Sequence, residues 1–475
     1  MEEKYIAAID LGSYKIALSV ARIKGDDVQI VYYKETPSDG IKNSIITIPQ
    51  RASVPLKRII DDAEKELMIK IMQVVVSLPR YSVKQEKATG NLERTDPDDY
   101  ISREEVEALK SIAIDTYPLD NGDTQIMYGA VAQSFATDDE IQLFENDVVG
   151  TLSHALEGNF KIFIGNRRYT MAIDKIFNSL GVAIAKKYFL PDVVARTVLS
   201  ADDMENGVAL VDFGAGVTSV AIYHGGIMRH YAAIPFGGRS ITMDIRTECS
   251  ISEKLAENIK LAYGACIPSK LANLSEKTIQ IRYEDAPYKE LSVKYLSEII
   301  DARAREIIDA ILYEIQESNL ADCLRAGVVV TGGSANLVNF ANLFKEKSGY
   351  NVRPGYPKAL FSSAGCTGVF DTSAASAIGM VLAAKDDNLP DCVQAPEPVE
   401  EAPEVVETVS EAPEEEVFRD SLFGEGEIET VTPEKKEKAP RKIKVGRQKK
   451  DKNGNVLTIF WTKIKSAIEE EEEEV

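Results

Sequence analysis

The chain has 475 residues, enough for two to four domains of roughly 100–200 residues each. Its 55 Lys and Arg against 76 Asp and Glu give a net charge of −21, which argues against a nucleic-acid-binding protein because such proteins usually carry a basic surface. The five Cys include no C-x-x-C pair and the three His form no metal motif. A disulfide framework is therefore disfavoured, and a reducing cytosol fits better.

The N-terminus has no signal-peptide pattern, and no stretch reaches 18 apolar residues. The longest apolar run, around residues 374–384, is too short to cross a bilayer. We therefore do not expect this chain to be an integral membrane protein.

The first expected elements are a buried strand, a tight turn and a second strand within residues 5–23. The turn contains Asp10 and Gly12. Glycine in such a turn lets backbone N–H groups approach phosphate oxygens. An Asp at the end of a strand can hold Mg²⁺ through water. A single copy of this pattern would fit an ordinary hairpin equally well.

The pattern returns in residues 207–223, where Asp212 and Gly214 take the places of Asp10 and Gly12. Two copies predict two similar α/β domains that face each other and favour a nucleotide site between them. In the stretch that separates the copies, Ser102 and Glu105 have the spacing of a capping box and predict the start of a helix.

A third glycine-containing element begins at a buried strand over residues 327–331 and continues through Gly332 and Gly333. Two glycines leave room for a flat ring or a ribose against the backbone. Alone, the turn would be an ordinary strand-to-helix connection. The chain has no G-x-x-x-x-G-K-[ST], which excludes P-loop NTPases. Gly214-x-Gly216 leads into a strand, which disfavours a Rossmann site.

The periodicity predicts an α/β protein. Strands are expected near residues 5–10, 15–23, 28–34, 73–78, 208–212, 218–223 and 327–331, and helices at 55–69, 102–114, 167–180, 252–263, 291–317, 337–347 and 374–384.

Charge is concentrated in the C-terminal part of the chain. Residues 386–475 hold 25 acidic and 13 basic side chains, so the preceding 385 residues carry only −9 of the total −21. Residues 386–433 hold 16 acids and one Arg, with repeated Pro-Glu units, and we expect them to be disordered. Residues 434–452 hold ten Lys and Arg against three acids.

The segment 453–468 has the pattern of an amphipathic helix. Its apolar residues recur at spacings of three and four and would share one face: Leu457, Phe460, Trp461, Ile464 and Ile468. A helix of this length suits the membrane interface rather than a span, and the preceding basic run would add attraction to anionic lipid. A helix that docks on the protein's own body remains the alternative. Residues 469–474 are all Glu and would oppose binding to anionic lipid.

The three glycine turns together resemble the phosphate-1, phosphate-2 and adenosine loops of the actin/Hsp70/sugar-kinase superfamily. Further stretches resemble the FtsA family of actin-like bacterial cell-division proteins: residues 234–245, 256–264 and 299–307. The segment of about 85 residues after Arg80 lies where FtsA carries its 1C subdomain. The resemblance covers residues 1–385, and the linker with its terminal helix also fits.

The resemblance implies an actin-like, two-lobed fold, a duplication of a ribonuclease-H-like domain. The expected divisions are 1–79 with 166–200 (first lobe, 1A), 80–165 (inserted 1C subdomain), 201–385 (second lobe, with outer part 236–325 and a last helix 374–384 that returns to the first lobe), 386–433 (disordered acidic linker), 434–452 (basic segment), 453–468 (amphipathic helix) and 469–475 (acidic tail).

The resemblance also implies the ligands, ATP and Mg²⁺, and the residues that bind them. The nucleotide would contact Asp10, Gly12, Ser13, Tyr14, Lys15, Gly214, Ala215, Gly216, Val217, Gly237, Gly238, Glu257, Lys260, Gly332, Gly333, Ser334 and Leu337. Asp10 and Asp212 would hold the metal, and Asp212 is the catalytic candidate. Ala215, Val217 and Ser219 replace residues that are usual in this family, so we expect at most a weak ATPase.

The implied function is a cell-division protein that assembles into filaments and tethers FtsZ polymers to the inner face of the cytoplasmic membrane at the septum. Arg303 resembles part of the patch that receives the C-terminal peptide of FtsZ, although it could instead pair with an acid on its own helix. Other division proteins are further expected partners; nucleic acid is not.

Two other functions stay open at this stage. One is a PilM-like scaffold with the same fold, and the other is a phosphotransferase of the sugar or acetate kinase type, which would need an acceptor pocket. The inserted segment disfavours an MreB-like protein. The lack of strand-like runs after residue 385 excludes an Hsp70.

Overall fold

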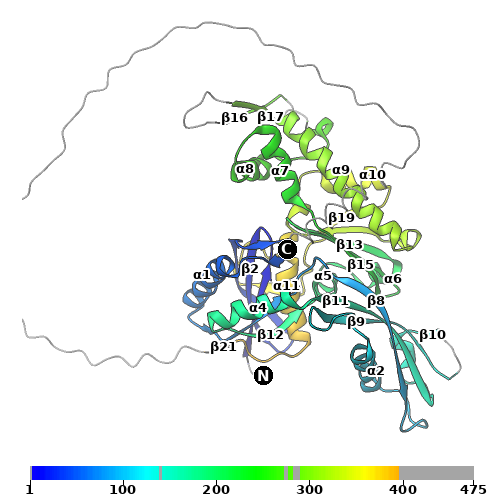
Figure 1. The fold of residues 1–475 in the computed structure, drawn as a ribbon. Coiled ribbons are helices and arrows are strands. Elements are labelled where there is room, and N and C mark those ends of the chain that lie inside the picture. Colours follow the sequence, from blue (N-terminus) through cyan, green and yellow to red (C-terminus); the bar gives the residue numbers. More distant parts are fainter. Residues whose placement is uncertain (1–2, 139–141, 272–275, 282–288, 395–475) are drawn as a thin grey trace, which may run out of the picture. The chain divides into compact units, whose positions relative to one another are not determined.

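The computed structural model describes residues 3–138, 142–271, 276–281 and 289–394 (Figure 1). The predicted amphipathic helix, the basic segment, the acidic tail and most of the acidic linker lie outside these residues. Among the helices described, none is long and apolar enough to cross a membrane.

The first lobe is built on a six-stranded sheet with the order β12-β7-β1-β2-β3-β20. Strand β1 pairs antiparallel with β2 and parallel with β7. Its residues Ile6–Ile9 are fully buried, as expected for a strand whose sheet is covered on both faces. The strands are β1 (Glu3–Leu11), β2 (Lys15–Lys24), β3 (Asp27–Pro37), β7 (Gln73–Ser77), β12 (Ala183–Tyr188) and β20 (Ser362–Ser363), with the short pairs β4 (Ile41–Lys42) and β5 (Ile45–Ile46), and β6 (Lys70–Ile71) and β21 (Val393–Gln394).

Helices cover both sides of this sheet, and α1 and α11 lie on opposite sides of β2 in Figure 1. Helix α11 is apolar all round and almost entirely buried, which is typical of a helix enclosed in a protein core. It packs on α5 and on β1 and β2. The helices of this lobe are α1 (Pro49–Leu67), α4 (Arg167–Leu180), α5 (Leu190–Val198) and α11 (Ala375–Asp386).

The second lobe repeats this strand arrangement. Its five-stranded sheet has the order β15-β14-β13-β18-β19, in which β13 pairs antiparallel with β14 and parallel with β18. Strand β13 therefore corresponds to β1, and β18 corresponds to β7. The strands are β13 (Val208–Phe213), β14 (Thr218–His224), β15 (Ile227–Ile234), β18 (Gly327–Thr331) and β19 (Val352–Pro354). The two matching sheets give the duplicated, actin-like architecture that the sequence predicts.

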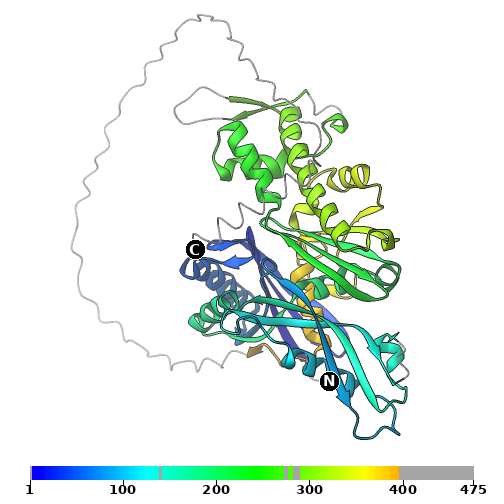
Figure 2. The ribbon, with the colours of Figure 1, turned by 45° about the vertical axis from the view of Figure 1, so that its right-hand side comes forward.

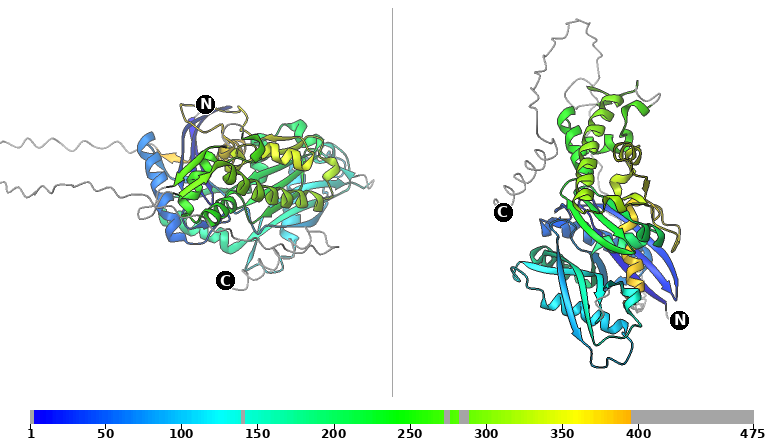
Figure 3. Two further views of the ribbon diagram at one scale, coloured as in Figure 1. Left: turned by 90° about the horizontal axis from the view of Figure 1, so that it is seen from above. Right: turned by 90° about the vertical axis from the view of Figure 1, so that its right-hand side faces the viewer.

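Helices of the second lobe lie along its sheet and extend beyond it (Figures 2 and 3). Helix α9 contacts α7, α10 and strand β14. These elements are α6 (Ala201–Asn206), α7 (Gly238–Cys249), α8 (Glu253–Tyr263), β16 (Thr278–Ile281), β17 (Lys289–Ser292), α9 (Val293–Glu317) and α10 (Phe340–Ser348), with 3₁₀ turns at Pro268–Lys270 (η1), Ala321–Cys323 (η3), Gly333–Asn336 (η4) and Thr372–Ala374 (η5).

The residues between β7 and α4 form a separate four-stranded sheet with the order β10-β9-β11-β8. It has its own hydrophobic cluster, which includes Leu109, Phe135 and Phe160. Helix α2 packs on this sheet, and its N-terminus carries the predicted capping box: Ser102 Oγ accepts from Glu105 N at 3.2 Å, and Ser102 N donates to Glu105 Oε2 at 2.8 Å. The elements are β8 (Lys84–Glu93), α2 (Arg103–Thr116), β9 (Gln125–Ala136), β10 (Gln142–Leu143), α3 (Glu145–Val148) and β11 (Ala155–Asn166).

The folded body continues beyond residue 385, where the sequence places the start of the linker. Cys392 is fully buried, and its N–H donates to the carbonyl of Tyr5 at 2.8 Å. The next residues form β21, which pairs with β6. Backbone hydrogen bonds to the first lobe therefore hold residues 392–394, although composition places them in an acidic linker.

The inserted sheet is joined to the second lobe through strand β15. Gln85 Nε2 donates to His230 Nδ1 at 2.9 Å, and Tyr231 N donates to Gln85 Oε1 at 3.1 Å. Gln133 Nε2 also donates to the Met228 carbonyl at 3.0 Å. These three hydrogen bonds between the insert and the second lobe therefore all involve residues 228–231 of β15.

His230 makes this interface sensitive to acid. Burial, with a smaller contribution from the Lys161 ammonium, lowers the pKa of His230 to about 4. The unfolded chain takes up a proton below about pH 6.5, whereas the folded chain does not until about pH 4. The contribution of His230 to stability is therefore full above about pH 6.5 and is lost as the pH falls toward 4.

We predict that His230→Gln reduces this loss. The urea concentration at which half of the wild-type chain is unfolded should be lower at pH 4.5 than at pH 7. In the variant, the difference between the two pH values should be smaller. The exposed His154 gives a matched control, since His154→Gln should leave the wild-type pH dependence in place. Equal pH dependence in the wild type and His230→Gln would contradict the assignment.

Candidate functional site

Loop 1, residues 12–14 between β1 and β2, is a tight hairpin turn. A Cβ atom at Gly12 would lie 2.5 Å from the Lys15 carbonyl oxygen, so the turn admits only glycine there. Ser13 Oγ accepts a hydrogen bond from Ser44 N at 2.8 Å. The Tyr14 side chain is about half exposed, and Lys15, at the start of β2, pairs with Glu35 of β3.

Loop 2, residues 214–217 between β13 and β14, has the same geometry. A Cβ atom at Gly214 would lie 2.7 Å from the Val217 carbonyl oxygen, which reproduces the contact of Gly12 with Lys15. The side chain of Val217 is buried. The two loops face each other, because a Cβ atom at Gly216 would lie 2.8 Å from Ser13 Oγ.

Loop 3, residues 332–337 after β18, lies against loop 2. Ser334 Oγ donates to the Gly214 carbonyl at 2.9 Å. Gly332 adopts a φ of 89°, and a Cβ atom there would lie 2.5 Å from Asp212 Oδ1. Gly333 is more open, since a Cβ atom there would meet only Ser373 Cβ, at 3.7 Å. Leu337 follows the turn and is half-buried.

The N-terminus of α7 completes this group of loops. Gly238 N donates to the Gly214 carbonyl at 3.0 Å, and Arg239 N donates to the Ala215 carbonyl at 2.8 Å. A Cβ atom at Gly237 would lie 2.3 Å from the Gly214 carbonyl oxygen. The backbone of α7 and loop 2 is therefore closely packed, and glycine at 237 permits it.

Glu257 and Lys260 on α8 point to the same helix terminus. Lys260 Nζ donates to the Gly238 carbonyl at 2.9 Å and to Thr242 Oγ1 at 2.8 Å, and it pairs with Glu257 Oε2 at 2.8 Å. Burial lowers the pKa of Lys260, and the Glu257 carboxylate opposes that shift. The two side chains hold each other and α7 in place beside loop 3.

Asp10 and Asp212, at the ends of the two corresponding strands, are joined by one guanidinium. Arg80 Nη1 donates to Asp212 Oδ2 at 2.6 Å, and Arg80 Nη2 contacts Asp10 Oδ1 at 3.3 Å. The side chains are 11%, 8% and 13% exposed for Arg80, Asp212 and Asp10. The three side chains form a nearly buried ion triad of two carboxylates and one guanidinium.

Burial and charge shift the pKa values of Asp212 and Arg80. Burial raises the pKa of Asp212, and the nearby Asp10 carboxylate adds to this effect, while Arg80 opposes it. Burial alone would lower the pKa of Arg80, but the carboxylates of Asp212 and Asp10 outweigh it and raise the pKa. The guanidinium therefore stays charged at every accessible pH.

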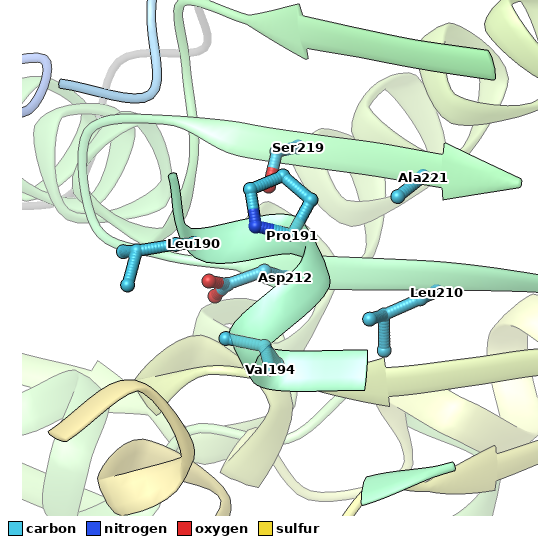
Figure 4. Close-up of a pocket in the computed structure, with 7 residues that line it drawn as sticks. All are labelled: Leu190, Pro191, Val194, Leu210, Asp212, Ser219 and Ala221. Carbon is cyan, nitrogen blue, oxygen red and sulfur yellow. The ribbon is translucent and has the colours of Figure 1, made fainter. Parts of the chain in front are cut away.

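A small cavity of about 10 Å³ lies beside Asp212 (Figure 4), about the space of one water molecule. Leu190, Pro191 and Val194 of α5 face Asp212 and Ser219 across it.

These contacts decide whether a metal fits the predicted ligands. Mg²⁺ is bound by oxygen atoms and retains several water molecules, whereas both predicted carboxylates are hydrogen-bonded to Arg80. Asp10 and Asp212 in this arrangement therefore do not fit a bridging Mg²⁺.

The structure brings most of the predicted nucleotide residues together around loops 1, 2 and 3. Arg303 lies elsewhere, on α9, where it pairs with Asp244 at 2.5 Å and with Glu306 at 2.6 Å. The five predicted membrane residues, Leu457 to Ile468, lie outside the described part of the chain.

Sequence reasoning missed Arg80 as a site residue. The signal is visible in retrospect, because β7 runs parallel to β1 and the carboxyl ends of parallel strands meet at one edge of a sheet. A residue shortly after β7 therefore lies beside Asp10, as Asp212 does from the other lobe. Ser376 was missed too; its Oγ accepts from Arg80 Nη2 at 3.1 Å.

Comparison with known proteins supports the resemblance. Residues 209–379 match the family model "Cell division protein FtsA". The chain is 29% identical over 391 residues to the cell division protein FtsA of Borreliella burgdorferi, covering 80% of this chain and 91% of the relative. It is 26% identical over 364 residues to FtsA of Neisseria meningitidis, covering 76% and 85%.

The fold is also found among solved structures. A chain of a PilM–PilN type IV pilus biogenesis complex aligns with a TM-score of 0.56 at 13% identity, covering 80% of this chain and 98% of that chain. At this identity the likeness concerns the fold alone, and it supports the actin-like architecture described above.

We predict that the two neighbouring glycines of loop 3 respond differently to alanine. Gly332→Ala should lower the free energy of unfolding by about 2–4 kcal/mol, because the side chain is strained at positive φ and meets Asp212 and the Phe213 carbonyl. Gly333→Ala should change it by less than about 0.5 kcal/mol. Urea unfolding measures both, and equal effects would contradict the described geometry of loop 3.

Proposed function

We propose that this chain, which belongs to the FtsA family, is a cell-division protein that binds ATP, forms actin-like filaments and tethers FtsZ polymers to the inner face of the cytoplasmic membrane at the septum. The observation that carries the proposal is the pair of equivalent glycine turns, loops 1 and 2, that face each other between two matching sheets. Such turns present backbone N–H groups to phosphate oxygens.

Several features support ATP as the nucleotide. Helix α7 begins beside loop 2, and the positive end of its dipole favours an anionic group nearby, while its first N–H groups are used to hold loop 2. Glu257, Lys260 and Ser334 provide polar atoms beside loop 3, and Gly333 leaves space for a flat ring there. The phosphates would lie along loops 1 and 2, with the adenosine toward loop 3 and α8.

Weak hydrolysis fits the chemistry of the site better than rapid turnover. Asp212, the catalytic candidate, is hydrogen-bonded to Arg80 at 2.6 Å and its side chain is nearly buried, so it is poorly placed to accept a proton from a substrate. Val217 buries its side chain and offers no hydroxyl to a phosphate. ATP would then act mainly by stabilising the conformation to which it binds.

The proposed partner surface for the C-terminal peptide of FtsZ includes Arg303. Its guanidinium is about one-third exposed and pairs with Asp244 and Glu306. An acidic group of a peptide would have to compete with these two carboxylates. Assembly into filaments and contacts with other division proteins belong to the same proposal.

Membrane attachment is assigned to the amphipathic segment 453–468, with Leu457, Phe460, Trp461, Ile464 and Ile468 on its apolar face. The basic run before it would favour anionic lipid. With this anchor the protein would attach to the membrane surface, as proposed for a member of this family, and would not need any of the described helices to cross the bilayer.

A PilM-like scaffold is the second candidate, and the shared fold with a PilM–PilN complex favours it. A phosphotransferase is less well supported, because the carboxylate that would accept the proton of an acceptor hydroxyl is the one bound by Arg80.

We predict that Gly333→Val weakens ATP binding by about tenfold or more, because its side chain fills the space assigned to the adenosine, while the urea midpoint stays unchanged; tenfold corresponds to about 1.4 kcal/mol. Equilibrium binding with a fluorescent ATP analogue measures the effect. Gly122→Val, at an open position far from the loops, is the control. If Gly333→Val binds ATP with unchanged affinity, the assignment of the adenosine to loop 3 is wrong.

We predict that the full chain sediments with vesicles containing anionic lipid and carries FtsZ with it, whereas a chain ending at Lys452 does neither. Trp461→Glu should reduce lipid binding strongly, because it places a charge on the apolar face. Thr462→Glu, on the polar face, is the matched control. If the full chain stays in the supernatant and ignores FtsZ, the tether fails and the PilM-like scaffold becomes the better proposal.

A further inference from the structure

We propose that Arg80 is the resident cation of this site: its guanidinium takes the position between Asp10 and Asp212 that a divalent ion would occupy, so the chain binds its nucleotide without a metal ion bridging the two aspartates. The inference rests on the proposed function for the identity of the nucleotide. The exclusion of the metal rests only on residues 10, 80 and 212.

The first argument is the position of the guanidinium. Asp10 and Asp212 are the penultimate residues of β1 and β13, so each lobe supplies one carboxylate. Arg80 spans both, at 3.3 Å to Asp10 and 2.6 Å to Asp212. A hydrated Mg²⁺ needs the same oxygen atoms and the space between them, and it would also be repelled by the fixed positive charge.

The second argument is that the guanidinium is anchored. Arg80 Nη2 donates to Ser376 Oγ at 3.1 Å, and the Arg80 carbonyl accepts from Tyr231 Oη at 2.7 Å. Rotation of Arg80 away from the site would leave two nearly buried carboxylates unpaired, which is strongly unfavourable.

The third argument concerns what the guanidinium can still bind. Arg80 Nε is buried and has no hydrogen-bond partner among the described residues, so this N–H has room only for a water molecule enclosed in the protein. An arginine cannot lose its proton under ordinary conditions. Unlike a metal ion, this cation is removed neither by a chelator nor by a change in pH.

Mn²⁺ binding to the full chain without nucleotide tests the exclusion directly, with electron paramagnetic resonance of the free ion as the readout. The wild type should show only weak binding to its acidic surface. Arg80→Met, which keeps most of the volume but removes the charge, should gain one site per chain at least about tenfold tighter. The double variant Arg80→Met with Asp212→Asn should lose that site.

Arg94 supplies the matched control. It is a buried arginine that pairs with Glu105 in the inserted sheet, so Arg94→Met also removes a buried guanidinium but frees only one carboxylate. It should gain no Mn²⁺ site. A tight site in the wild type, or none in a folded Arg80→Met, would overturn the proposal.

A second measurement needs only the wild type. ATP affinity in excess EDTA and in excess Mg²⁺ should agree within about threefold. A tenfold or larger loss in EDTA would overturn the proposal even if Arg80→Met fails to fold. If ATP binds in neither condition, the proposed function fails. The Mn²⁺ titration of the wild type then still tests the inference about Arg80. A tight Mn²⁺ site in the wild type would refute that inference, and the absence of such a site would support it.

Discussion

The ion triad of Asp10, Arg80 and Asp212 is the interaction around which the site is organised. Two carboxylates at the ends of equivalent strands repel each other, and burial increases that repulsion because the local dielectric constant is low. One guanidinium offsets it and thereby ties the first lobe to the second. Loops 1, 2 and 3 all surround this triad, so their mutual positions depend on it.

The same arginine lies where the inserted sheet leaves the first lobe. Arg80 stands between β7 and β8, and its carbonyl accepts from Tyr231 on β15. Strand β15 also binds Gln85 and Gln133 of the insert and continues into the glycines that begin α7. Strand β15 therefore contacts the insert and leads directly into the residues that hold loop 2.

Apolar strands were well predicted, and polar ones were not. Strands β1, β2, β13 and β18 match their expected ranges because each is a nearly continuous apolar run. Strand β8 reads Lys-Gln-Glu-Lys-Ala-Thr-Gly-Asn-Leu-Glu with only two of its residues buried, so composition gives little signal. Its neighbour β11 supplies the antiparallel pairing that makes it a strand. The sequence also did not predict that residues 392–394 belong to the folded body, because they are held by hydrogen bonds to Tyr5 and to strand β6, which are distant in the sequence.

The sequence by itself determined the duplicated Asp-x-Gly turns, the strands that lead into them and the resemblance to the FtsA family, because each of these is a local pattern. Tertiary structure alone decided what the two aspartates contact. Arg80 lies 70 residues from Asp10 and 132 from Asp212 along the chain, and no local pattern relates them. Only the parallel pairing of β7 with β1 and the approach of the second lobe place the guanidinium between the carboxylates, where burial makes the pairing obligatory.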